Sequence, residues 1–171
     1  MKITIIIPSY NSQDFIEDCL RSIDNQSYKQ FEIIIVDNES TDKTVEIVKK
    51  FQFSSKIKIQ LIIEKDLGIY DAINKGISKS NGVIISVLHT DDVYYDNNAL
   101  YELVNAFARN KADIVYGDLI YVKRKNTNSI IRYWKSSDFK KGLFHLGWNP
   151  PHPSFFVKKN CFIESGFYNI H

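Results

Sequence analysis

Cysteine, proline and long apolar runs are scarce in this sequence. Its two cysteines, Cys19 and Cys161, lie far apart in 171 residues, which argues against a disulfide framework and a cysteine-based zinc site. The longest apolar stretches, at 3–7, 33–36 and 83–88, fall far short of the roughly 20 residues that a membrane-spanning helix needs. Because the first residues also lack the apolar core of a secretory signal, we expect a cytoplasmic protein.

The charge is nearly balanced overall but unevenly distributed. The net charge is +2, yet residues 121–171 carry 9 basic and 2 acidic side chains, whereas residues 1–120 carry 13 and 18. The basic part is also rich in aromatic residues, so peripheral contact with the anionic inner face of a plasma membrane is one interpretation. A solvated surface is the alternative, and we expect no nucleic-acid partner.

Short β-branched runs alternate with amphipathic segments along the chain. The runs that we interpret as strands cover residues 2–7, 32–36, 56–63, 83–88 and 113–116. The first, second and fourth are almost wholly apolar, which indicates strands covered on both faces. This alternation predicts an α/β fold, a three-layer α/β/α sandwich around a mainly parallel, mixed sheet.

Helices are expected between these runs, and a hairpin after them. Apolar side chains recur at helical spacing in 15–23, 45–51, 69–77 and 97–109. Residues 117–122 and 130–134 predict a β-hairpin that turns at 125–128.

Two adjacent carboxylates follow the apolar run 83–88. A buried strand there would deliver Asp91 and Asp92 to one edge of the sheet. Adjacent carboxylates repel each other and lose hydration, and a divalent cation offsets that cost. Because Mg²⁺ and Mn²⁺ are commonly held by one or two carboxylates together with substrate phosphates, the pair predicts a metal–diphosphate site. A turn followed by a helix cap is the alternative that an isolated Asp pair favours.

The loops after the other strands also carry polar and aromatic groups. Pro8, Ser9 and Tyr10 follow the first run, and Tyr10 offers a flat face for a base. Asn11 or Ser12 is expected to cap the next helix. Asp37 follows the second run, and Ser40 or Thr41 is expected to cap the helix after it, with Asp42 at its positive end.

The segment after Gly68 predicts a helix with two different faces. Its polar face holds Asp71, Asn74, Lys75 and Ser78, and its apolar face holds Ile69, Ile73, Gly76 and Ile77. This polar face could line the cleft, and Asp71, in the first helical turn, fits that position best, while Gly76 permits close packing on the sheet. For Asn74, Lys75 and Ser78 we prefer a plain solvated stripe.

Together these segments resemble the family 2 glycosyltransferases of the bacterial polysaccharide type. The motifs stand in the family's order and spacing: Ile5-Ile6-Ile7-Pro8-Ser9-Tyr10-Asn11, Phe31-Glu32-Ile33-Ile34-Ile35-Val36-Asp37, Ser40-Thr41-Asp42, Asp66-x-Gly68-Ile69-Tyr70-Asp71-Ala72-x-Asn74-Lys75-Gly76 and Asp91-Asp92. The resemblance implies the A-type glycosyltransferase fold with a Rossmann-like nucleotide-binding half. We expect one domain, 1–171, with the nucleotide-sugar part in 1–120 and the start of the acceptor side in 121–171.

The resemblance also implies roles for individual residues. Pro8 and Tyr10 would flank the base, Asp37 would accept a hydrogen bond from it, and Asp71 would lie nearby. Asp91 would contact the ribose.

Asp92 would be the catalytic residue that binds Mn²⁺ or Mg²⁺ between both phosphates. Ser9, Gly68 and Lys65 complete the expected nucleotide site, Lys65 as a second group for the phosphate charge. Trp148 and His152 are expected on the acceptor side.

Four features depart from the family pattern. Glu39 occupies a position where relatives commonly have Gly, and we expect its side chain to point outward. His89 either reaches a phosphate or packs beneath the loop, and we prefer the second. Pro153 replaces a polar residue of many relatives. Inverting members use a carboxylate base beyond the segment matched by 164–169, and no acid follows Gly166.

The missing acid leaves the catalytic base open. We expect a chain that is truncated at its carboxyl end; His152, Asp118 or Glu164 is the alternative base, with His152 a weak candidate.

The resemblance predicts a metal-dependent inverting glycosyltransferase. It would move a sugar from a nucleotide-diphosphosugar, with UDP as the default, to a saccharide or lipid-linked acceptor in cell-surface polysaccharide synthesis. The alternatives are a nucleotidyltransferase that makes sugar nucleotides and a non-catalytic nucleotide- or membrane-binding module. Against the nucleotidyltransferase, the first loop has neither the glycines nor the basic residues that cradle a triphosphate.

Overall fold

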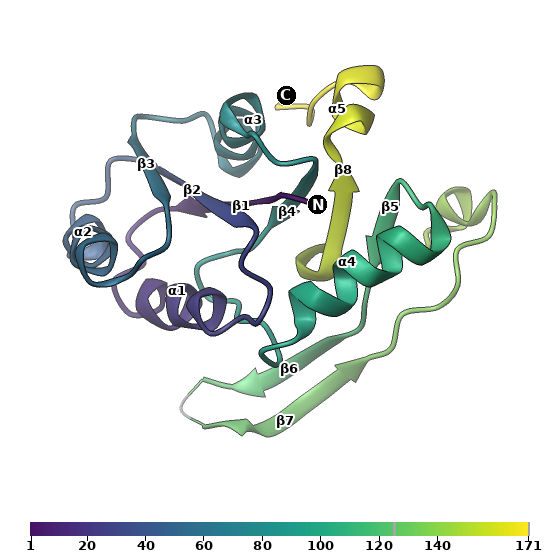
Figure 1. Ribbon diagram of the computed structural model, residues 1–171, viewed down its shortest axis with the longest axis horizontal. Helices are drawn as coiled ribbons and strands as arrows, with labels where there is room; N and C mark the ends of the chain where they lie inside the picture. Colours follow the sequence, from purple (N-terminus) through teal and green to yellow (C-terminus); the bar gives the residue numbers. More distant parts are fainter. Residues whose placement is uncertain (125, 171) are drawn as a thin grey trace.

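The computed structural model describes residues 1–124 and 126–170, which form a three-layer α/β/α arrangement (Figure 1). The strands of the central sheet are β1 (Ile3–Ser9), β2 (Phe31–Asp37), β3 (Ile59–Ile63), β4 (Ile84–Val87), β5 (Ile114–Tyr116) and β8 (Phe155–Lys158). Their order across the sheet is β3-β2-β1-β4-β8-β5. The first four strands are mutually parallel and β8 is antiparallel to both neighbours, which confirms the predicted mixed sheet.

Helices cover both faces of this sheet. They are α1 (Ile16–Asp24), α2 (Thr44–Ser54), α3 (Ile69–Lys79), α4 (Ala99–Asn110) and α5 (Lys159–Ser165). Figure 1 shows α1, α2 and α4 on one side of the sheet, and α3 and α5 on the other. None of the helices in the described residues is both long enough and apolar enough to cross a bilayer.

Alternating isoleucines on β1 explain this layering. Ile3, Ile5 and Ile7 pack in the cluster that contains the buried residues of α1, α2 and α4. Ile6 points to the opposite face and packs with Ile73 of α3. Because successive side chains of a strand alternate between faces, a strand covered on both must be apolar throughout. All residues of β1, β2 and β4 are buried, as the sequence predicts.

Gly76 sets how closely α3 approaches the sheet. A Cβ atom at this position would lie 2.5 Å from Cγ2 of Ile6. The expectation that Gly76 permits close packing is therefore confirmed.

The strand β8 and the helix α5 have no counterpart in the sequence interpretation. β8 has four residues and follows a proline-rich segment, so its apolar run is too short to be distinguished from a loop. It nevertheless separates β4 from β5 and completes the sheet.

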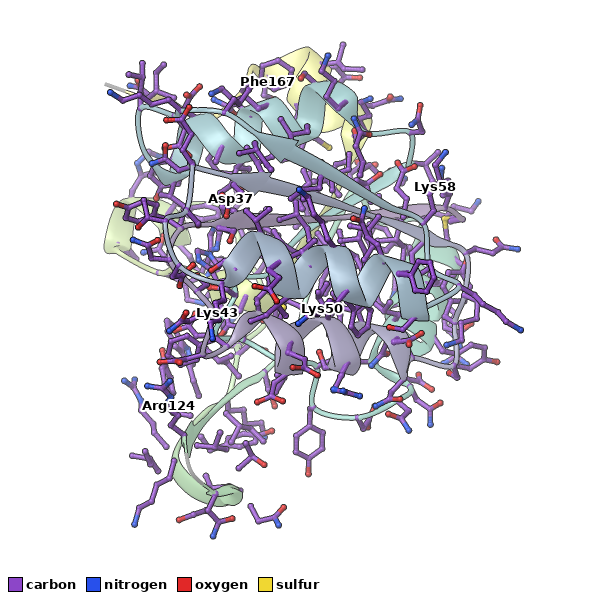
Figure 2. All side chains as sticks on the ribbon, turned by 90° about the vertical axis from the view of Figure 1, so that its left-hand side faces the viewer. Asp37, Lys43, Lys50, Lys58, Arg124 and Phe167 are labelled. Carbon is purple, nitrogen blue, oxygen red and sulfur yellow. The ribbon has the colours of Figure 1, made fainter. Side chains whose placement is uncertain are left out.

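The strands β6 (Leu119–Lys123) and β7 (Asn126–Trp134) form the expected hairpin as a separate sheet. β7 already begins at Asn126, so residues 126–128 lie in the strand rather than in the expected turn. Lys125, also expected in the turn, lies outside the described residues. Arg124, labelled in Figure 2, holds the hairpin end against the start of α1. Its guanidinium pairs with Asp14 at 3.1 Å and lies over the Phe15 ring at 3.9 Å.

The expected helix caps are wrong in both cases. The helix α1 begins at Ile16, where no side chain provides a cap, and neither Asn11 nor Ser12 caps it. Before α2 it is Asp42, rather than Ser40 or Thr41, whose carboxylate accepts the amide hydrogen of Thr44 at 2.9 Å.

A buried carboxylate fixes the amino ends of the central strands. Glu32 of β2 is 5% exposed and accepts hydrogen bonds from Lys2 at 2.6 Å, Thr4 at 2.7 Å and the amide of Asn81 at 2.6 Å. Burial raises the pKa of Glu32, but these hydrogen bonds outweigh burial and lower it to about 2.

We expect Glu32→Gln to lower the free energy of unfolding by about 2 kcal/mol at pH 7, because charged hydrogen bonds are lost in a buried place. Since the native pKa lies below the ordinary 4.5, the contribution is complete above about pH 4.5 and is lost as the pH falls toward 2. Urea unfolding at neutral and acid pH measures both effects. Glu46→Gln on the exposed surface of α2 is the control and should change nothing measurable. Parallel acid loss in the wild type and Glu32→Gln would contradict the assignment.

Candidate functional site

The parallel strands bring their following loops to one edge of the sheet. β1 ends at Ser9, which lies opposite Asp37 at the end of β2, and β4 ends on the other side of β1. Figure 2 shows Asp37 and Lys43 at this end of the molecule and Lys58 at the opposite end. The predicted site residues that follow these strands therefore share one edge.

The loops after β1 and β2 are locked together through Asn11. Its backbone is left-handed, with φ of +44°. Its amide donates to the hydroxyl of Ser40 at 2.8 Å, and its side-chain oxygen accepts the amide hydrogen of Thr41 at 2.9 Å. The next amide, that of Ser12, donates to the hydroxyl of Thr44 at 2.7 Å. The first two loops thus form one preassembled unit.

Asp37 lies at the base of this unit and is fully buried. One of its oxygens accepts the amide hydrogen of Ser40 at 2.8 Å and the other accepts the Ser40 hydroxyl at 2.7 Å. Beside it, Ser9 is 5% exposed. Within the described residues, the Ser9 hydroxyl is the one buried side-chain polar atom without a hydrogen-bond partner. An unpaired buried hydroxyl is costly, so it marks a place where a ligand atom would be favoured.

Pro8 and Tyr10 occupy different levels of the same edge. Pro8 is buried within β1 and pairs with Val36, whereas Tyr10 is 60% exposed at the rim. The Tyr10 ring is therefore open to stacking. Flanking of a base by both residues stays a prediction.

The acidic doublet lies in a cavity of about 360 Å³ beyond β4. Its lining residues are Ile69, Tyr70, Ile73, His89, Asp91, Asp92, His152 and Pro153. Asp91 is exposed and Asp92 is partly buried. Burial and the neighbouring Asp91 raise the pKa of Asp92, while His89 opposes the shift.

Three contacts hold the doublet loop in place. The Asp92 amide donates to the His89 carbonyl at 3.1 Å, and the buried thiol of Cys19 donates to the same carbonyl at 3.5 Å. The hydroxyl of Thr90 donates to that of Ser12 at 2.9 Å, which connects this loop to the first one. All three loops are therefore linked.

His89 and His152 face each other in the cavity. Their ring centroids are 5.7 Å apart with an interplanar angle of 72°. His89 lines this cavity, so its ring lies beside the doublet loop and against His152. The expectation that it packs beneath the loop stays a prediction. Partial burial and the nearby His89 lower the pKa of His152.

The three alternative bases fall in different places. His152 lines the cavity. Asp118 lies outside it, where its carboxylate accepts hydrogen bonds from Tyr133 and Ser136 that lower its pKa. Glu164 lies on the exposed side of α5 and is not among the lining residues.

In the cavity of the acidic doublet, α3 contributes Ile69, Tyr70 and Ile73, none of which belongs to its polar face. Asp71 accepts the amide hydrogen of Leu67 at 3.0 Å and pairs with Lys75 at 3.2 Å. The hydrogen bond from the Leu67 amide is the main reason that the pKa of Asp71 is lowered, and Lys75 lowers it further. The sequence shows which residues share a helix face but not which neighbour each face meets.

Gly68 and Lys65 lie in the loop before α3. Gly68 has φ of +122° and precedes the first turn of the helix, a conformation that requires glycine. The side chain of Lys65 is exposed. Their roles in nucleotide binding, like that of Asp71, stay predictions.

Asn74 has a function that the sequence interpretation missed. Instead of forming part of a solvated stripe, its amide nitrogen donates to the Tyr168 carbonyl at 2.8 Å, and its oxygen accepts the Tyr168 amide hydrogen at 3.0 Å. The Tyr168 ring stacks on Tyr70 with centroids 5.4 Å apart. The segment after α5 is thereby fastened to the wall of the cavity.

The sequence matches the model of Glycosyl transferase family 2 over residues 4–162. The chain belongs to this family. A PGL/p-HBAD biosynthesis glycosyltransferase of Mycobacterium bovis (strain BCG / Pasteur 1173P2) is 32% identical over 170 residues, which cover 98% of this chain and 63% of that protein. A poly(ribitol-phosphate) beta-glucosyltransferase of Bacillus spizizenii is 36% identical over 124 residues, 70% of this chain and 19% of that protein.

Solved structures share the fold of this family 2 chain. TarS 1-349 of S. aureus, in complex with UDP-GlcNAc, has a TM-score of 0.77 at 19% identity and matches 99% of this chain and 49% of its own. The mannosyltransferase PcManGT from Pyrobaculum calidifontis, in complex with GDP-Man and Mn²⁺, has a TM-score of 0.72 at 21% identity. The match covers 98% of this chain and 47% of that one. The expected A-type fold is confirmed. The chain spans about half the length of these neighbours.

Glu39, which we expect to replace a glycine of the family, has a φ of +52°, in the left-handed region that glycine favours. Its side chain is exposed, as expected. A residue other than glycine is strained in this backbone conformation, so Glu39 adopts it at a cost in backbone strain.

The two expected acceptor-side residues are divided between two cavities. His152 lines the cavity of the acidic doublet, whereas Trp148 lines a second cavity with Trp134.

Asn11 offers a test of the loop network. We expect Asn11→Ala to lower the free energy of unfolding by about 1–2 kcal/mol, because alanine is strained at positive φ and loses the hydrogen bond to Thr41. Asn11→Asp is the matched control, because it keeps both an oxygen acceptor and tolerance of this backbone, and it should lose less than half as much. Urea unfolding measures both variants. Equal losses in the two variants would contradict this explanation.

Proposed function

We propose that the chain binds a nucleotide-diphosphosugar, with UDP as the nucleotide, and transfers its sugar to a saccharide or lipid-linked acceptor in cell-surface polysaccharide synthesis. Family membership supports this proposal over a nucleotidyltransferase. The observation that carries it is the cavity in which Asp91 and Asp92 face His89 beside the joined loops of β1 and β2.

The donor would extend from the joined loops into this cavity. The base would stack on the exposed Tyr10, with Asp37 and the unpaired Ser9 hydroxyl beneath it. Asp91 would receive the ribose. Lys65 would add positive charge near the diphosphate.

The residues present fit a divalent cation that is shared with a ligand. Within the described residues, no three His, Cys, Asp or Glu side chains form a metal cluster, so a cage made by protein alone is not available. Asp92 would hold Mn²⁺ or Mg²⁺ through one carboxylate, with His89 nearby and substrate phosphates supplying further oxygens, which is the usual arrangement for Mg²⁺. A bound cation there neutralises charge on the departing diphosphate.

His152 fits the part of the base in an inverting transfer. An acceptor oxygen would form its bond to the anomeric carbon on the side opposite the diphosphate while the bond to the diphosphate oxygen breaks. The hydroxyl proton would pass to a ring nitrogen of His152. Partial burial and His89 lower the pKa of His152, which favours the neutral ring that a base requires.

The doublet is tested by calorimetric titration of UDP with and without Mn²⁺. We expect Mn²⁺ to tighten UDP binding at least about tenfold in the wild type, because the cation joins the carboxylate to the phosphates. Asp92→Asn should abolish this gain. Asp18→Asn, which removes the same charge from the exposed surface of α1, is the control and should keep it. Equal Mn²⁺ dependence in Asp92→Asn would remove Asp92 from the metal role.

Contact with an anionic membrane is a second proposal, carried by the hairpin β6–β7. Ile130, Ile131 and Tyr133 are 58%, 64% and 54% exposed on it. Basic side chains, Lys123 and Lys135 among them, lie on the same two strands or directly after them. Exposed apolar and aromatic side chains bordered by basic ones suit a lipid surface with negative headgroups.

Sedimentation with vesicles tests this contact. We expect binding to vesicles that contain phosphatidylglycerol, weakened several-fold at about 0.5 M salt because exposed charges are screened. Ile131→Ser should weaken binding, whereas Ile163→Ser, an equally exposed site on α5, should not. Binding that neither salt nor Ile131→Ser changes would contradict the proposal.

A further inference from the structure

A second cavity, of about 340 Å³, lies between the end of β7 and the segment after the short helix η1 (Leu143–Leu146). Its lining residues are Trp134, Lys135, Ser136, Ser137, Gly147, Trp148, Asn149 and Pro150. Both tryptophans of the chain are therefore in this one place. The volume is within the usual range of small-ligand sites.

Trp148 is held rigidly in this cavity. Its ring makes edge contacts with Tyr116 at 5.6 Å and Phe144 at 5.3 Å between centroids. Its indole nitrogen donates to the Ser137 hydroxyl at 2.8 Å. Ser137 is fixed in turn, because its carbonyl accepts the Tyr116 hydroxyl hydrogen at 2.9 Å.

Another part of the lining is fixed through Asp118. The amide and hydroxyl of Ser136 donate to one Asp118 oxygen at 2.9 and 2.8 Å. The guanidinium of Arg132 lies 5.5 Å from the centre of the Trp134 ring, which restrains that indole. Both tryptophans are thus preorganised although they lie outside the apolar core clusters. Preorganised aromatic groups lose little freedom on binding.

The lining has the chemistry that a sugar ring requires. The indole rings offer flat apolar faces for the C–H side of a pyranose. The Asn149 amide and the serine hydroxyls offer donors and acceptors for its hydroxyl groups. One cationic side chain, that of Lys135, lines the cavity, which is too little positive charge for a diphosphate.

The two cavities are neighbours along the chain. Pro150 lines the tryptophan cavity, and His152 lines the cavity of the acidic doublet. Two residues span at most about 7 Å, so a short oligosaccharide can reach from one cavity to the other. The intervening proline also stiffens this connection.

We propose that the tryptophan cavity binds an internal sugar unit of an oligosaccharide acceptor whose end reaches the donor cavity. This assignment rests on the proposed glycosyl transfer. It makes the chain a transferase that prefers an extended acceptor to a single sugar.

Intrinsic fluorescence tests the assignment directly, because both tryptophans report on this cavity. We titrate the chain with the trimer of N-acetylglucosamine and with maltotriose, and use sorbitol as the polyol control. A saturable change with at least one trisaccharide and none with sorbitol is expected. Asn149→Ala should weaken that binding about fivefold, and Trp148→Phe, which keeps an aromatic ring if folding tolerates it, about tenfold.

Titration of UDP with Mn²⁺ on the same preparation separates the two proposals. If UDP binds and neither trisaccharide gives a saturable change, the cavity assignment is overturned and the donor site stands. If a trisaccharide binds equally well to Asn149→Ala and to the wild type, the assignment is also overturned. If trisaccharides bind as expected but UDP does not, the saccharide site stands and the proposed transfer fails.

Discussion

The enclosure of β1 is the constraint on which the rest of the structure depends. This strand has a parallel neighbour on each edge and a helical layer on each face, so all seven of its residues are buried. Polar groups have no place along such a strand and are restricted to its ends. At the amino end they form the Glu32 network, and at the carboxyl end they begin with Ser9 and Asp37. The buried core therefore restricts the polar groups around β1 to the two ends of the strand.

The carboxyl edge is organised by hydrogen bonds that cross from loop to loop. Ser12 shows this most clearly, because its amide reaches Thr44 in the second loop and its hydroxyl accepts from Thr90 in the third. Ser40 is likewise engaged by Asn11 and Asp37. These residue types favour helix caps when only local sequence is considered. Here tertiary partners take their hydrogen-bonding groups, and for this reason the expected caps do not form.

The sequence was most informative where one physical rule acts alone. Continuous apolar runs identified the buried strands, because a strand buried on both faces requires apolar residues. Gly76 indicated the close approach of α3, because a larger residue would collide with Ile6. Predictions were wrong where a distant segment decides the outcome. The polar face of α3 meets the returning chain at Tyr168, and β8 gains its place only by pairing with β4. Such contacts between remote segments leave little local signal in one sequence.

The separation of His152 from Trp148 follows from the same topology. β8 enters the sheet antiparallel between β4 and β5, so the chain before it must pass the carboxyl edge of β4. This path places His152 against the doublet and leaves Trp148 beside the hairpin.

Asp91 and Asp92 are charged groups at this edge that do not stabilise the fold. Partial burial beside a second carboxylate disfavours the charged form of Asp92, so these charges oppose the folded state. The contacts that hold the loop run instead through the His89 carbonyl, the Asp92 amide and Thr90. A loop that is fixed by its main chain can present two repelling carboxylates in one cavity. Under the proposed function, a bound cation would relieve that repulsion, so the electrostatic strain that folding leaves at this edge would favour binding of a metal–diphosphate ligand.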